Sequence, residues 1–395
     1  MYATDHCHIM SRLRKIFHWS SGIVSMLASF AVGLLLLASA WAGEVDPYRL
    51  PIAAVVAMLM PLVLPVAVVL FVADALWWRR SAVVIGIALA LSMPSVFETF
   101  PVGTGSGVVT PQNSRGMLQL TVLTYNCAGW VDLTGRYEGG KNPTIETILR
   151  TDADIVALQE ADSLGMPYRN HVTRPMLDSL HLHYPYVIED PTLRMLLLSK
   201  YPARSLGLPL TKLGDTEDEI AGYTIDFNGR QITLFNMHLH SIGLTNRDKE
   251  LYENVTRLGD KEEMNRTTVT RVRYDLVGKL SGAAAVRSRQ VKMLCGYVSR
   301  YAAKDVIVCG DFNDVPSCYA LNSLHRLGLR EVYPAVGRGY MSTFNRNRFW
   351  FRIDHVLWRG NMRPVGIDRV GGITSDHYAL LTTFDVPRGD HEGER

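Results

Sequence analysis

The chain has 395 residues, hydrophobic side chains at 47% of its positions and a formal net charge of +3. This length allows two or three domains, and the small net charge neither requires nor excludes a polyanionic partner such as nucleic acid. The average composition hides two unlike parts, because the chain is mostly apolar up to about Phe100 and ordinarily soluble after Pro111. We therefore expect a membrane part followed by a soluble part.

Three apolar segments in the first part are candidates for membrane spans. They cover residues 16–43, 52–73 and 82–98, and about 20 apolar residues cross a hydrocarbon core of about 30 Å. Pro61 and Pro65 lie inside the second segment, where neighbouring helices can satisfy the carbonyl groups that a kink frees. The third segment is the shortest. The pattern predicts three transmembrane helices.

A secretory signal peptide is the alternative interpretation of the first segment. The basic residues Arg12, Arg14 and Lys15 resemble an n-region, and residues 38–40 (Ala-Ser-Ala) resemble a cleavage site. The apolar run is long for a signal peptide, however, and two further apolar segments follow at once. These features favour a helix that stays in the membrane.

The distribution of charge predicts the orientation of the spans. Basic residues precede the first span and also lie at Arg79 and Arg80, whereas the loop between the first two spans holds Glu44 and Asp46. The rule that basic loops stay inside places the N-terminus in the cytoplasm and the soluble domain on the outer, periplasmic or extracellular face. No span carries a charge in the middle of the membrane apart from Asp74 near a span end, so the spans are expected to tether the protein and not to form a transport path.

The soluble part alternates short apolar runs with polar turns and helical stretches. We expect a membrane anchor over residues 1–100, a Gly/Ser/Thr-containing linker over 101–117, a catalytic domain over 118–386 and a tail over 387–395. Helices are expected at Asn142–Arg150 and Val286–Tyr301, and Asn228-Gly229 predicts a hairpin turn. The expected strands are Leu118–Tyr125, Ile155–Leu158, Met195–Ser199, Tyr223–Phe227, Gln231–Phe235, Asp305–Cys309, Ile353–Leu357, Met362–Val370 and Tyr378–Phe384. This order predicts an α/β fold in which two sheets pack together with helices outside.

Residues 243–280 interrupt this alternation, because they are polar and rich in both signs of charge. The sequence then becomes basic, and Arg287 and Arg289 are candidate contacts for an anionic substrate. The segment is either a solvated excursion or a flap that meets a substrate or lipid headgroups. The five cysteines show no metal-ligand spacing, and one or two disulfides could form if the soluble part faces an oxidising space.

Polar side chains with catalytic chemistry stand at the ends of the expected strands. They are Asn126, Glu160, His238, Asp311, Asn313, Asp354, Asp376 and His377. A single Asn or Asp after a strand is commonly a turn former, but the repetition of this placement along one chain indicates a site. Carboxylate and amide oxygens suit Mg²⁺ or Mn²⁺, and no cluster offers the thiolate and imidazole set of structural zinc.

In order and spacing, these segments resemble the endonuclease/exonuclease/phosphatase family over about Leu118–Phe384. The most specific motifs are Gly-Asp-Phe-Asn at residues 310–313 and Ser-Asp-His at residues 375–377. The resemblance implies a four-layered αββα sandwich (DNase I-like) and a hydrolase that cleaves phosphate esters with Mg²⁺ or Mn²⁺.

The resemblance also implies roles for single residues. Glu160 is the principal metal ligand, and Asn126 and Asp376 contribute to the metal site. Asp311 orients or deprotonates the attacking water, and Asn313 holds a phosphate oxygen. His238 contacts the phosphate, and His377 is a second imidazole. Asp354 accepts a hydrogen bond from His377 and so fixes its tautomer. Either Asp311 or His377 is the general base.

Two differences between this sequence and the motifs of particular branches of the family reduce the number of candidate substrates. Ala161-Asp162 follows Glu160 where abasic-site endonucleases have Thr-Lys, and the Arg that follows Gly-Asp-X-Asn in inositol phosphatases is missing. We expect a nuclease-like phosphodiesterase, with a phospholipid or sphingomyelin-type phosphodiesterase as the alternative. A non-catalytic binding module is disfavoured because the motif residues are all present. The expected partners are the phosphate-ester substrate and the membrane, and no protein partner is predicted.

Overall fold

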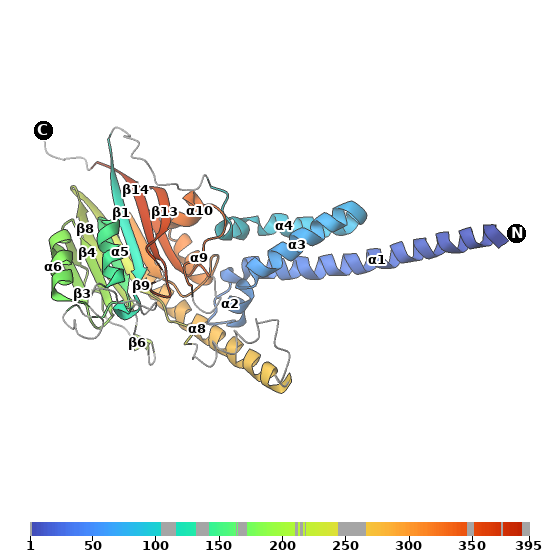
Figure 1. Cartoon of the computed structure of the whole chain (residues 1–395), viewed down its shortest axis with the longest axis horizontal. Helices are drawn as coiled ribbons and strands as arrows, with labels where there is room; N and C mark the ends of the chain where they lie inside the picture. Colours follow the sequence, from blue (N-terminus) through green and yellow to red (C-terminus); the bar gives the residue numbers. More distant parts are fainter. Residues whose placement is uncertain are drawn as a thin grey trace.

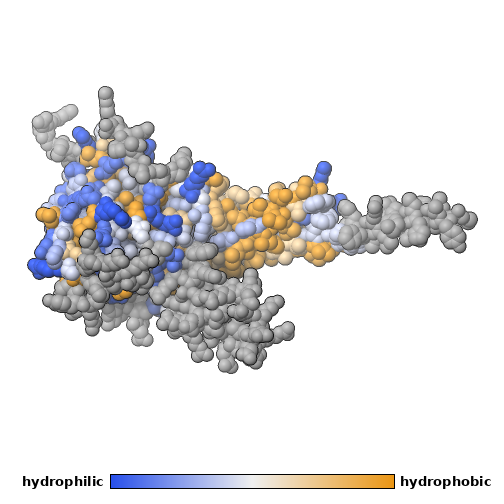
Figure 2. All heavy atoms as spheres, viewed as in Figure 1, coloured by the Kyte–Doolittle hydropathy of each residue, from blue (hydrophilic) through white to orange (hydrophobic). Residues whose placement is uncertain are grey.

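The computed structural model describes residues 2–103, 116–131, 142–162, 164, 172–209, 212–213, 216–217, 219–243, 266–345, 351–372 and 374–388. Long helices project from one side of a layered domain, and the N-terminus lies at their far end (Figure 1). The projecting part is apolar on its outside, whereas the visible face of the layered domain mixes polar and apolar side chains (Figure 2). The two unlike parts that the composition predicts are therefore two structural units.

The anchor contains three helices that are long and apolar enough to cross a membrane. These segments are Trp19–Glu44, Met60–Trp77 and Arg79–Thr99. They come from α1 (Tyr2–Trp41) with the short η1 (Ala42–Glu44), from α3 (Met60–Trp77) and from α4 (Arg79–Thr99). With three spans, α1 starts at the end of the bundle that lies far from the layered domain, and α4 ends beside that domain (Figure 1).

The second and third spans differ from their expected bounds. The predicted start of the second span at Ile52 is wrong, because a separate helix α2 (Ile52–Ala57) precedes α3. Pro61 occupies the first turn of α3, where its missing N–H leaves no hydrogen bond unmade, so a new helix starts there readily. The third span is longer than predicted at its start, because α4 begins at Arg79 and continues through Pro94.

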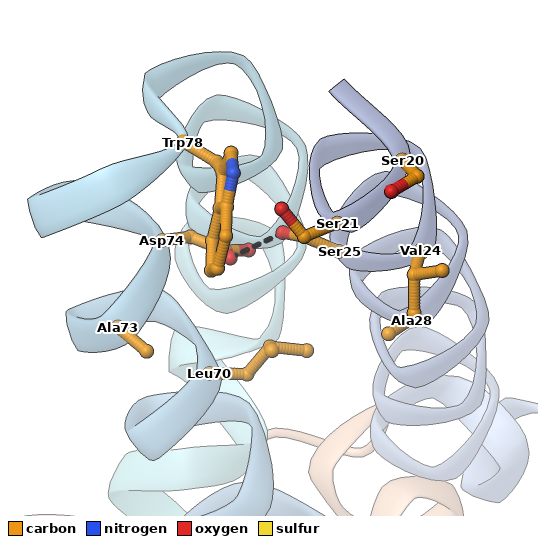
Figure 3. A pocket seen from close by; sticks show the side chains of 9 residues that line it. All are labelled: Ser20, Ser21, Val24, Ser25, Ala28, Leu70, Ala73, Asp74 and Trp78. Carbon is orange, nitrogen blue, oxygen red and sulfur yellow. Dashed lines mark hydrogen bonds between the residues drawn. The ribbon is translucent and has the colours of Figure 1, made fainter. Parts of the chain in front are cut away.

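Asp74 is the one buried acid inside the spans that the structure describes. Its carboxylate accepts a hydrogen bond from Ser25 Oγ at 2.5 Å (Figure 3). It also accepts one from Ser29 Oγ, and it is fully buried. Both serines lie on α1 and Asp74 lies on α3, so these bonds join two helices. Hydrogen bonds between helices hold spans together in a medium that offers no water.

Two six-stranded sheets form the centre of the catalytic domain. The first sheet has the order β13-β14-β1-β2-β4-β3, and the second has the order β11-β12-β10-β9-β8-β5. The strands of the first sheet are β1 (Met117–Asn126), β2 (Ile155–Gln159), β3 (Tyr186–Asp190), β4 (Met195–Ser199), β13 (Arg363–Val370) and β14 (Ala379–Pro387). Those of the second are β5 (Ala203–Ser205), β8 (Glu219–Phe227), β9 (Arg230–His238), β10 (Asp305–Asp311), β11 (Arg330–Glu331) and β12 (Asp354–Arg359). A separate pair joins β6 (Lys212–Leu213) to β7 (Thr216–Glu217).

Helices cover the outer face of each sheet. One buried cluster joins the first sheet to α5 (Pro143–Thr151) and α6 (Arg174–His183). Another joins the second sheet to α8 (Arg266–Tyr301) and α9 (Tyr319–His325). A third cluster fills the space between the sheets, and the short η2 (Ala128–Trp130) and α10 (Val332–Val336) complete the domain. The predicted four-layered αββα sandwich is confirmed.

Helix α8 is longer than predicted and includes the end of the polar segment that was expected to precede it. We expected a helix from Val286, but α8 begins at Arg266. The end of the predicted 243–280 excursion is therefore helical, and residues 244–265 lie outside the described part. The side chains Cys127, Cys295, Cys309 and Cys318 are free thiols, so the described part of the chain contains no disulfide.

The expected linker begins as part of the catalytic domain. Pro101 O accepts a hydrogen bond from Gly339 N at 2.8 Å, and Val102 forms an isolated bridge with Arg338. Residues 104–115 of the predicted linker lie outside the described residues. The anchor therefore contacts the catalytic domain directly where α4 ends.

Candidate active site

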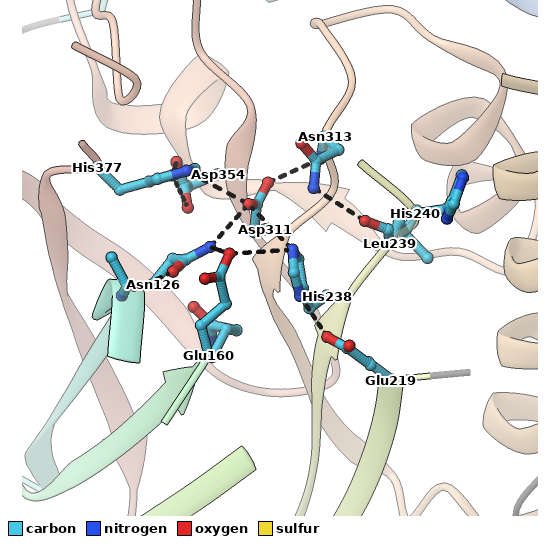
Figure 4. A network of polar contacts seen from close by, with 12 residues as sticks. Asn126, Glu160, Glu219, His238, Leu239, His240, Asp311, Asn313, Asp354 and His377 are labelled. Carbon is cyan, nitrogen blue, oxygen red and sulfur yellow. Dashed lines mark hydrogen bonds and ion pairs between the residues drawn. The ribbon is translucent and has the colours of Figure 1, made fainter. Parts of the chain in front are cut away.

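The strand ends bring the predicted site residues to one edge of the sandwich. β1 runs parallel to β2 and β9 runs parallel to β10, so the carboxyl ends of each pair lie together. Asp311 pairs with His238 across the second sheet, and Asn126 lies beside the strand that Glu160 follows. Since the two sheets face each other, both sets of side chains point into the same space (Figure 4).

A buried amide pair holds the two sheets in register beneath the site. Gln159 Nε2 donates to Asn236 Oδ1 at 2.6 Å, and Asn236 Nδ2 donates to Leu158 O at 2.9 Å. Both side chains are fully buried. A buried polar pair that lost one partner would leave an unsatisfied group, so these bonds restrict sliding of one sheet on the other. The sequence analysis did not identify this tie.

The backbone is unusual at three positions around the site. Glu160 and Asn313 have φ values of 50° and 49°, and Gly310 has a φ of 136°. A Cβ at Gly310 would overlap the carbonyl oxygen of Met237 on the neighbouring strand, so only glycine allows β9 and β10 to approach this closely. Left-handed conformations at residues other than glycine are typical of sites where the surrounding fold enforces them.

Asn126 connects the two acidic residues from opposite sheets. Its Nδ2 donates to Glu160 Oε1 at 3.0 Å and to Asp311 Oδ2 at 3.1 Å. His238 Nε2 lies 3.7 Å from the same two carboxylates. Four of the predicted site residues therefore surround one small volume.

Glu219 is a site residue that the sequence analysis missed. Its carboxylate binds Nδ1 of His238 directly. Burial alone would lower the pKa of His238, but the hydrogen bond to Glu219 and the charges of Asp311 and Glu160 raise it to about 9. The register of the predicted hairpin contains the missing signal, because Phe227 pairs with Arg230 and the same ladder pairs Glu219 with His238.

His377 and Asp354 form the second charged pair of the site. His377 Nδ1 lies 2.9 Å from Asp354 Oδ2, and His377 Nε2 lies 3.5 Å from Asp311 Oδ2. Burial lowers the pKa of His377, but Asp354 and Asp311 outweigh burial and raise it to about 10. The ring of Phe344 packs edge-on against the imidazole of His377, with 5.1 Å between the ring centroids, and limits the rotation of the imidazole.

Asp311 lies between the two histidines and is almost fully buried. Burial raises its pKa to about 6, against the lowering effect of His377 and His238 and with a further increase from Asp354. A carboxylate in this range gains and loses a proton near neutral pH, as a general base must. Its role as the general base stays a prediction.

Asn313 and Asp376 are placed differently from each other. Asn313 N donates to Asp311 Oδ1 at 2.8 Å, and its Nδ2 donates to Leu239 O at 2.9 Å. Asp376 is half-buried beside the Ser375 hydroxyl, which donates to Asn126 O at 2.8 Å. Asn313 is therefore bonded to Asp311, whereas the carboxylate of Asp376 lies 3.4 Å from the Ser375 hydroxyl.

Arg287 and Arg289 make contacts within the protein. Arg287 is buried, with Nε 3.2 Å from Asp314 Oδ2 and Nη1 donating to His240 O at 3.2 Å. The guanidinium carbon of Arg289 lies over the ring of Tyr48, 5.5 Å from the ring centroid. Substrate contact by either guanidinium group stays a prediction. Arg194, which the sequence analysis missed, is half-exposed and pairs with Asp162 Oδ1 at 3.0 Å, two residues from Glu160.

The donor set fits a divalent metal. Ligand atoms of Asp311, Asp354 and His377 lie within 4.8 Å of one another, and all three residues are buried. Glu160 adds a third carboxylate, and Asn126 adds an amide whose Nδ2 donates to Glu160 and Asp311. This oxygen-rich group could hold Mg²⁺ or Mn²⁺, and the nearby negative charges explain why a cation is favoured there.

The fold and the site define a hydrolase of phosphate esters, and comparisons with known proteins identify its family. The model of the endonuclease/exonuclease/phosphatase family matches residues 123–377. The chain belongs to this family, since the match covers more than half of it. A second model, described as a domain of unknown function (DUF8431), matches residues 20–99. A comparison with curated proteins finds no match to this chain.

Solved structures with a similar fold share little sequence with the chain. TDP2 of D. rerio in complex with a single-strand DNA product is 16% identical, with a TM-score of 0.43, and the match covers 68% of this chain and 99% of that one. A family protein of Bacteroides thetaiotaomicron is 14% identical, with a TM-score of 0.43 and coverage of 68% and 98%. Beta toxin of Staphylococcus aureus is 14% identical, with a TM-score of 0.39 and coverage of 67% and 99%.

Proposed function

We propose that the protein is a divalent-metal-dependent phosphodiesterase that hydrolyses its substrate by in-line attack of water. The observation that carries this proposal is the position of Asp311. A buried carboxylate with a pKa raised to about 6 lies within 3.7 Å of nitrogen atoms from Asn126, His238 and His377. Phosphoryl transfer needs a positioned water and stabilised charge more than it needs a covalent nucleophile.

The proposed metal ligands are Glu160 and Asn126, with Asp376 contributing. Their oxygen atoms are the kind that Mg²⁺ or Mn²⁺ prefers. The bound ion would neutralise charge on the phosphate oxygens. We assign His377 to the substrate or water and Asp354 to the orientation of His377, because Nδ1 of His377 donates to Asp354.

The two histidines are proposed to act on opposite sides of the phosphate. Both carry raised pKa values, about 9 for His238 and about 10 for His377, because each has a carboxylate on Nδ1. Imidazolium groups can donate hydrogen bonds through Nε2 to phosphate oxygens and stabilise charge that grows in the transition state. Asp311, which lies between them, is proposed to orient and deprotonate water, and Asn313 to hold a phosphate oxygen.

Two substrates are consistent with this chemistry. Nucleic acid is the first candidate, and the motif that starts with Gly-Asp-Phe-Asn resembles the nuclease branch as well as the sphingomyelinase and deadenylase branches. A lipid phosphodiester is the second candidate, and a specific observation favours it: the loop that follows Asp311 contacts the ends of two spans, at Gly43 and Glu98. The proposed location is the outer face of the membrane, with the N-terminus in the cytoplasm.

The test uses the full chain in nanodiscs with Mg²⁺ or Mn²⁺. Substrates are plasmid DNA, RNA, sphingomyelin, a phosphatidylinositol phosphate and bis-p-nitrophenyl phosphate, each with and without EDTA. We expect hydrolysis of the generic diester and its complete loss in EDTA. A nuclease should lose activity steeply between about 50 and 200 mM salt. The activity of a lipid phosphodiesterase should instead depend on the lipid content of the nanodiscs. Hydrolysis that persists in EDTA would contradict the proposal.

A further inference from the structure

The loop between β10 and α9 joins the catalytic residues to the anchor. This 312–318 loop begins directly after Asp311, and Asn313 on its first turn is bonded to Asp311 and to Leu239. At its other end, the Ser317 hydroxyl donates to the carboxylate of Glu98, in the last turn of α4. Ser317 follows Asn313 by four positions, so their Cα atoms lie no more than about 14 Å apart. The active site is therefore close to the end of a membrane span.

The end of the first span touches the same loop. A Cβ at Gly43 would overlap the carbonyl oxygen of Ser317, so the backbone of η1 lies directly against the loop. Ser317 itself has a φ of 58°, a conformation that needs support from its surroundings. Two spans thus hold one residue of the loop, one through a side chain and the other through close backbone packing.

A buried charged network continues from Glu98 to the strand that carries Asp354. Glu98 O accepts a hydrogen bond from Arg352 Nη2 at 2.5 Å, and the same nitrogen lies 3.4 Å from Glu331 Oε1. Glu331 Oε1 lies 2.7 Å from His355 Nδ1, and His355 Nε2 lies 3.0 Å from Asp314 O. Arg352, Glu331 and His355 are each at most 5% exposed.

This network meets the site at two points. His355 follows Asp354 on β12, so the contacts that fix His355 also fix the strand position that presents Asp354 to His377. Asp314 lies in the 312–318 loop, three residues after Asp311, and Arg287 of α8 binds its carboxylate. Buried ion pairs are costly unless every partner is present, so Arg352 and Glu331 hold each other in place. The backbone carbonyl of Glu98 accepts from this network, and the Glu98 carboxylate binds the 312–318 loop at Ser317.

We propose that the last turn of α4 is a functional part of the active site, and that Glu98 is a positioning residue for catalysis. The Glu98 carboxylate holds the 312–318 loop through Ser317, and thereby the position of Asp311 relative to Asp354 and His377. The backbone carbonyl of Glu98 accepts from Arg352 beside β12, and this second contact remains when the side chain is replaced. The anchor then does more than tether the enzyme, because the catalytic geometry depends on it. This inference rests on the proposed phosphodiesterase function.

Other contacts of the anchor provide a matched control. Glu44 Oε2 lies 2.7 Å from Arg326 Nη2, and Glu44 Oε1 accepts from Asn322 Nδ2 at 3.0 Å. This pair is about half exposed on both sides. Arg326 and Asn322 lie at α9, outside the 312–318 loop and β12. Exposed ion pairs contribute little to stability, so Glu44→Ala removes an anchor contact of the same chemistry without affecting the site.

The experiment measures hydrolysis of bis-p-nitrophenyl phosphate with Mg²⁺ by the full chain in nanodiscs. We expect Glu98→Ala to lower kcat by about 10- to 100-fold, because small displacements of catalytic groups have effects of this size. KM and the melting temperature should change little. Glu98→Gln keeps an oxygen acceptor for Ser317 and should recover most of the loss. Glu44→Ala should match the unmodified protein.

A second variant covers the case in which Glu98→Ala does not fold. Ser317→Ala removes only the hydroxyl that donates to Glu98 and should lower kcat in the same direction by a smaller factor. Unchanged kcat in Glu98→Ala, or in Ser317→Ala if only that variant folds, overturns the inference. An equal loss in Glu44→Ala also overturns it. If the unmodified protein hydrolyses no diester in Mg²⁺ or Mn²⁺, the proposed function fails first, so the two failures are distinguishable.

Discussion

The anchor and the catalytic domain both bury acidic side chains, but they pair them in opposite ways. In the anchor, each oxygen of Asp74 accepts a hydrogen bond from a neutral serine hydroxyl on α1. In the catalytic domain, Asp311 and Asp354 lie close together with His377 between their oxygens. A buried acid that is paired with neutral donors joins two helices, whereas buried acids that surround one point attract a cation or a proton.

The largest effect that tests this contrast is expected from Asp311→Asn. The amide cannot accept a proton from water, so we expect kcat for a generic diester to fall by about 10² to 10⁴. The variant should keep its secondary structure by circular dichroism, because the amide has nearly the same shape as the carboxylate. Activity within a few-fold of the unmodified protein would show that Asp311 is not the base.

The stability of the same variant provides an independent check in EDTA. Burial raises the pKa of Asp311 to about 6, above its ordinary value of 3.8. At pH 7 the carboxylate is ionised in both the folded and the unfolded protein, so the cost of burying its charge is fully present. Asp311→Asn removes that cost and should raise the melting temperature at pH 7. Lowering the pH below about 4 protonates the carboxyl in both states and should remove this difference.

An intermediate effect is expected from Glu219→Gln. The carboxylate of Glu219 binds Nδ1 of His238 and raises the pKa of that imidazole. Residues that orient a catalytic group in this way commonly change activity by about 10- to 100-fold, and we expect a loss of this size in kcat. The pKa of His238, measured by NMR titration in EDTA, should fall. Glu189→Gln is the matched control, because Glu189 lies on the edge of the other sheet, where it accepts from Leu164 N. An unchanged pKa of His238 would contradict the assignment.

The smallest effect on activity is expected from Asp74→Asn. The amide can still accept one hydrogen bond from the serines of α1, but it loses the charge and one acceptor oxygen. We expect kcat to stay unchanged and the free energy of unfolding to decrease by about 1 kcal/mol, a typical value for a hydrogen bond between spans. The melting temperature in nanodiscs and the rate of diester hydrolysis check the two parts. A large loss of kcat would contradict the interpretation that Asp74 only joins two helices of the anchor.

Much of the fold followed from local patterns in the chain. Most predicted strands appear within a few residues of their expected bounds, because alternating or fully apolar runs bury one or both faces of a sheet. The spans were predictable for the same reason, since length and apolarity alone decide whether a helix can cross a membrane. The start of the second span was wrong because an apolar run does not reveal where one helix ends and the next begins.

The site residues show the limit of this approach. Asn126, Glu160, His238 and Asp311 could be predicted to meet because they follow strands that lie side by side. Arg287 was considered for substrate binding because of its charge alone, and its burial against Asp314 became visible only in the folded domain. Charge is a property of one residue, but the partner of a charge depends on residues far away in the sequence.

By itself the sequence determined the two-part organisation, the order of the strands and the chemistry at their ends, since each of these depends on neighbours along the chain. Only the tertiary structure decided which acids are paired with neutral groups and which face each other. It also placed Glu98 against Ser317 and Arg352, across more than two hundred residues of sequence. Contacts of this kind arise from the packing of α4 and η1 on the catalytic domain, and no local pattern encodes where two distant surfaces touch.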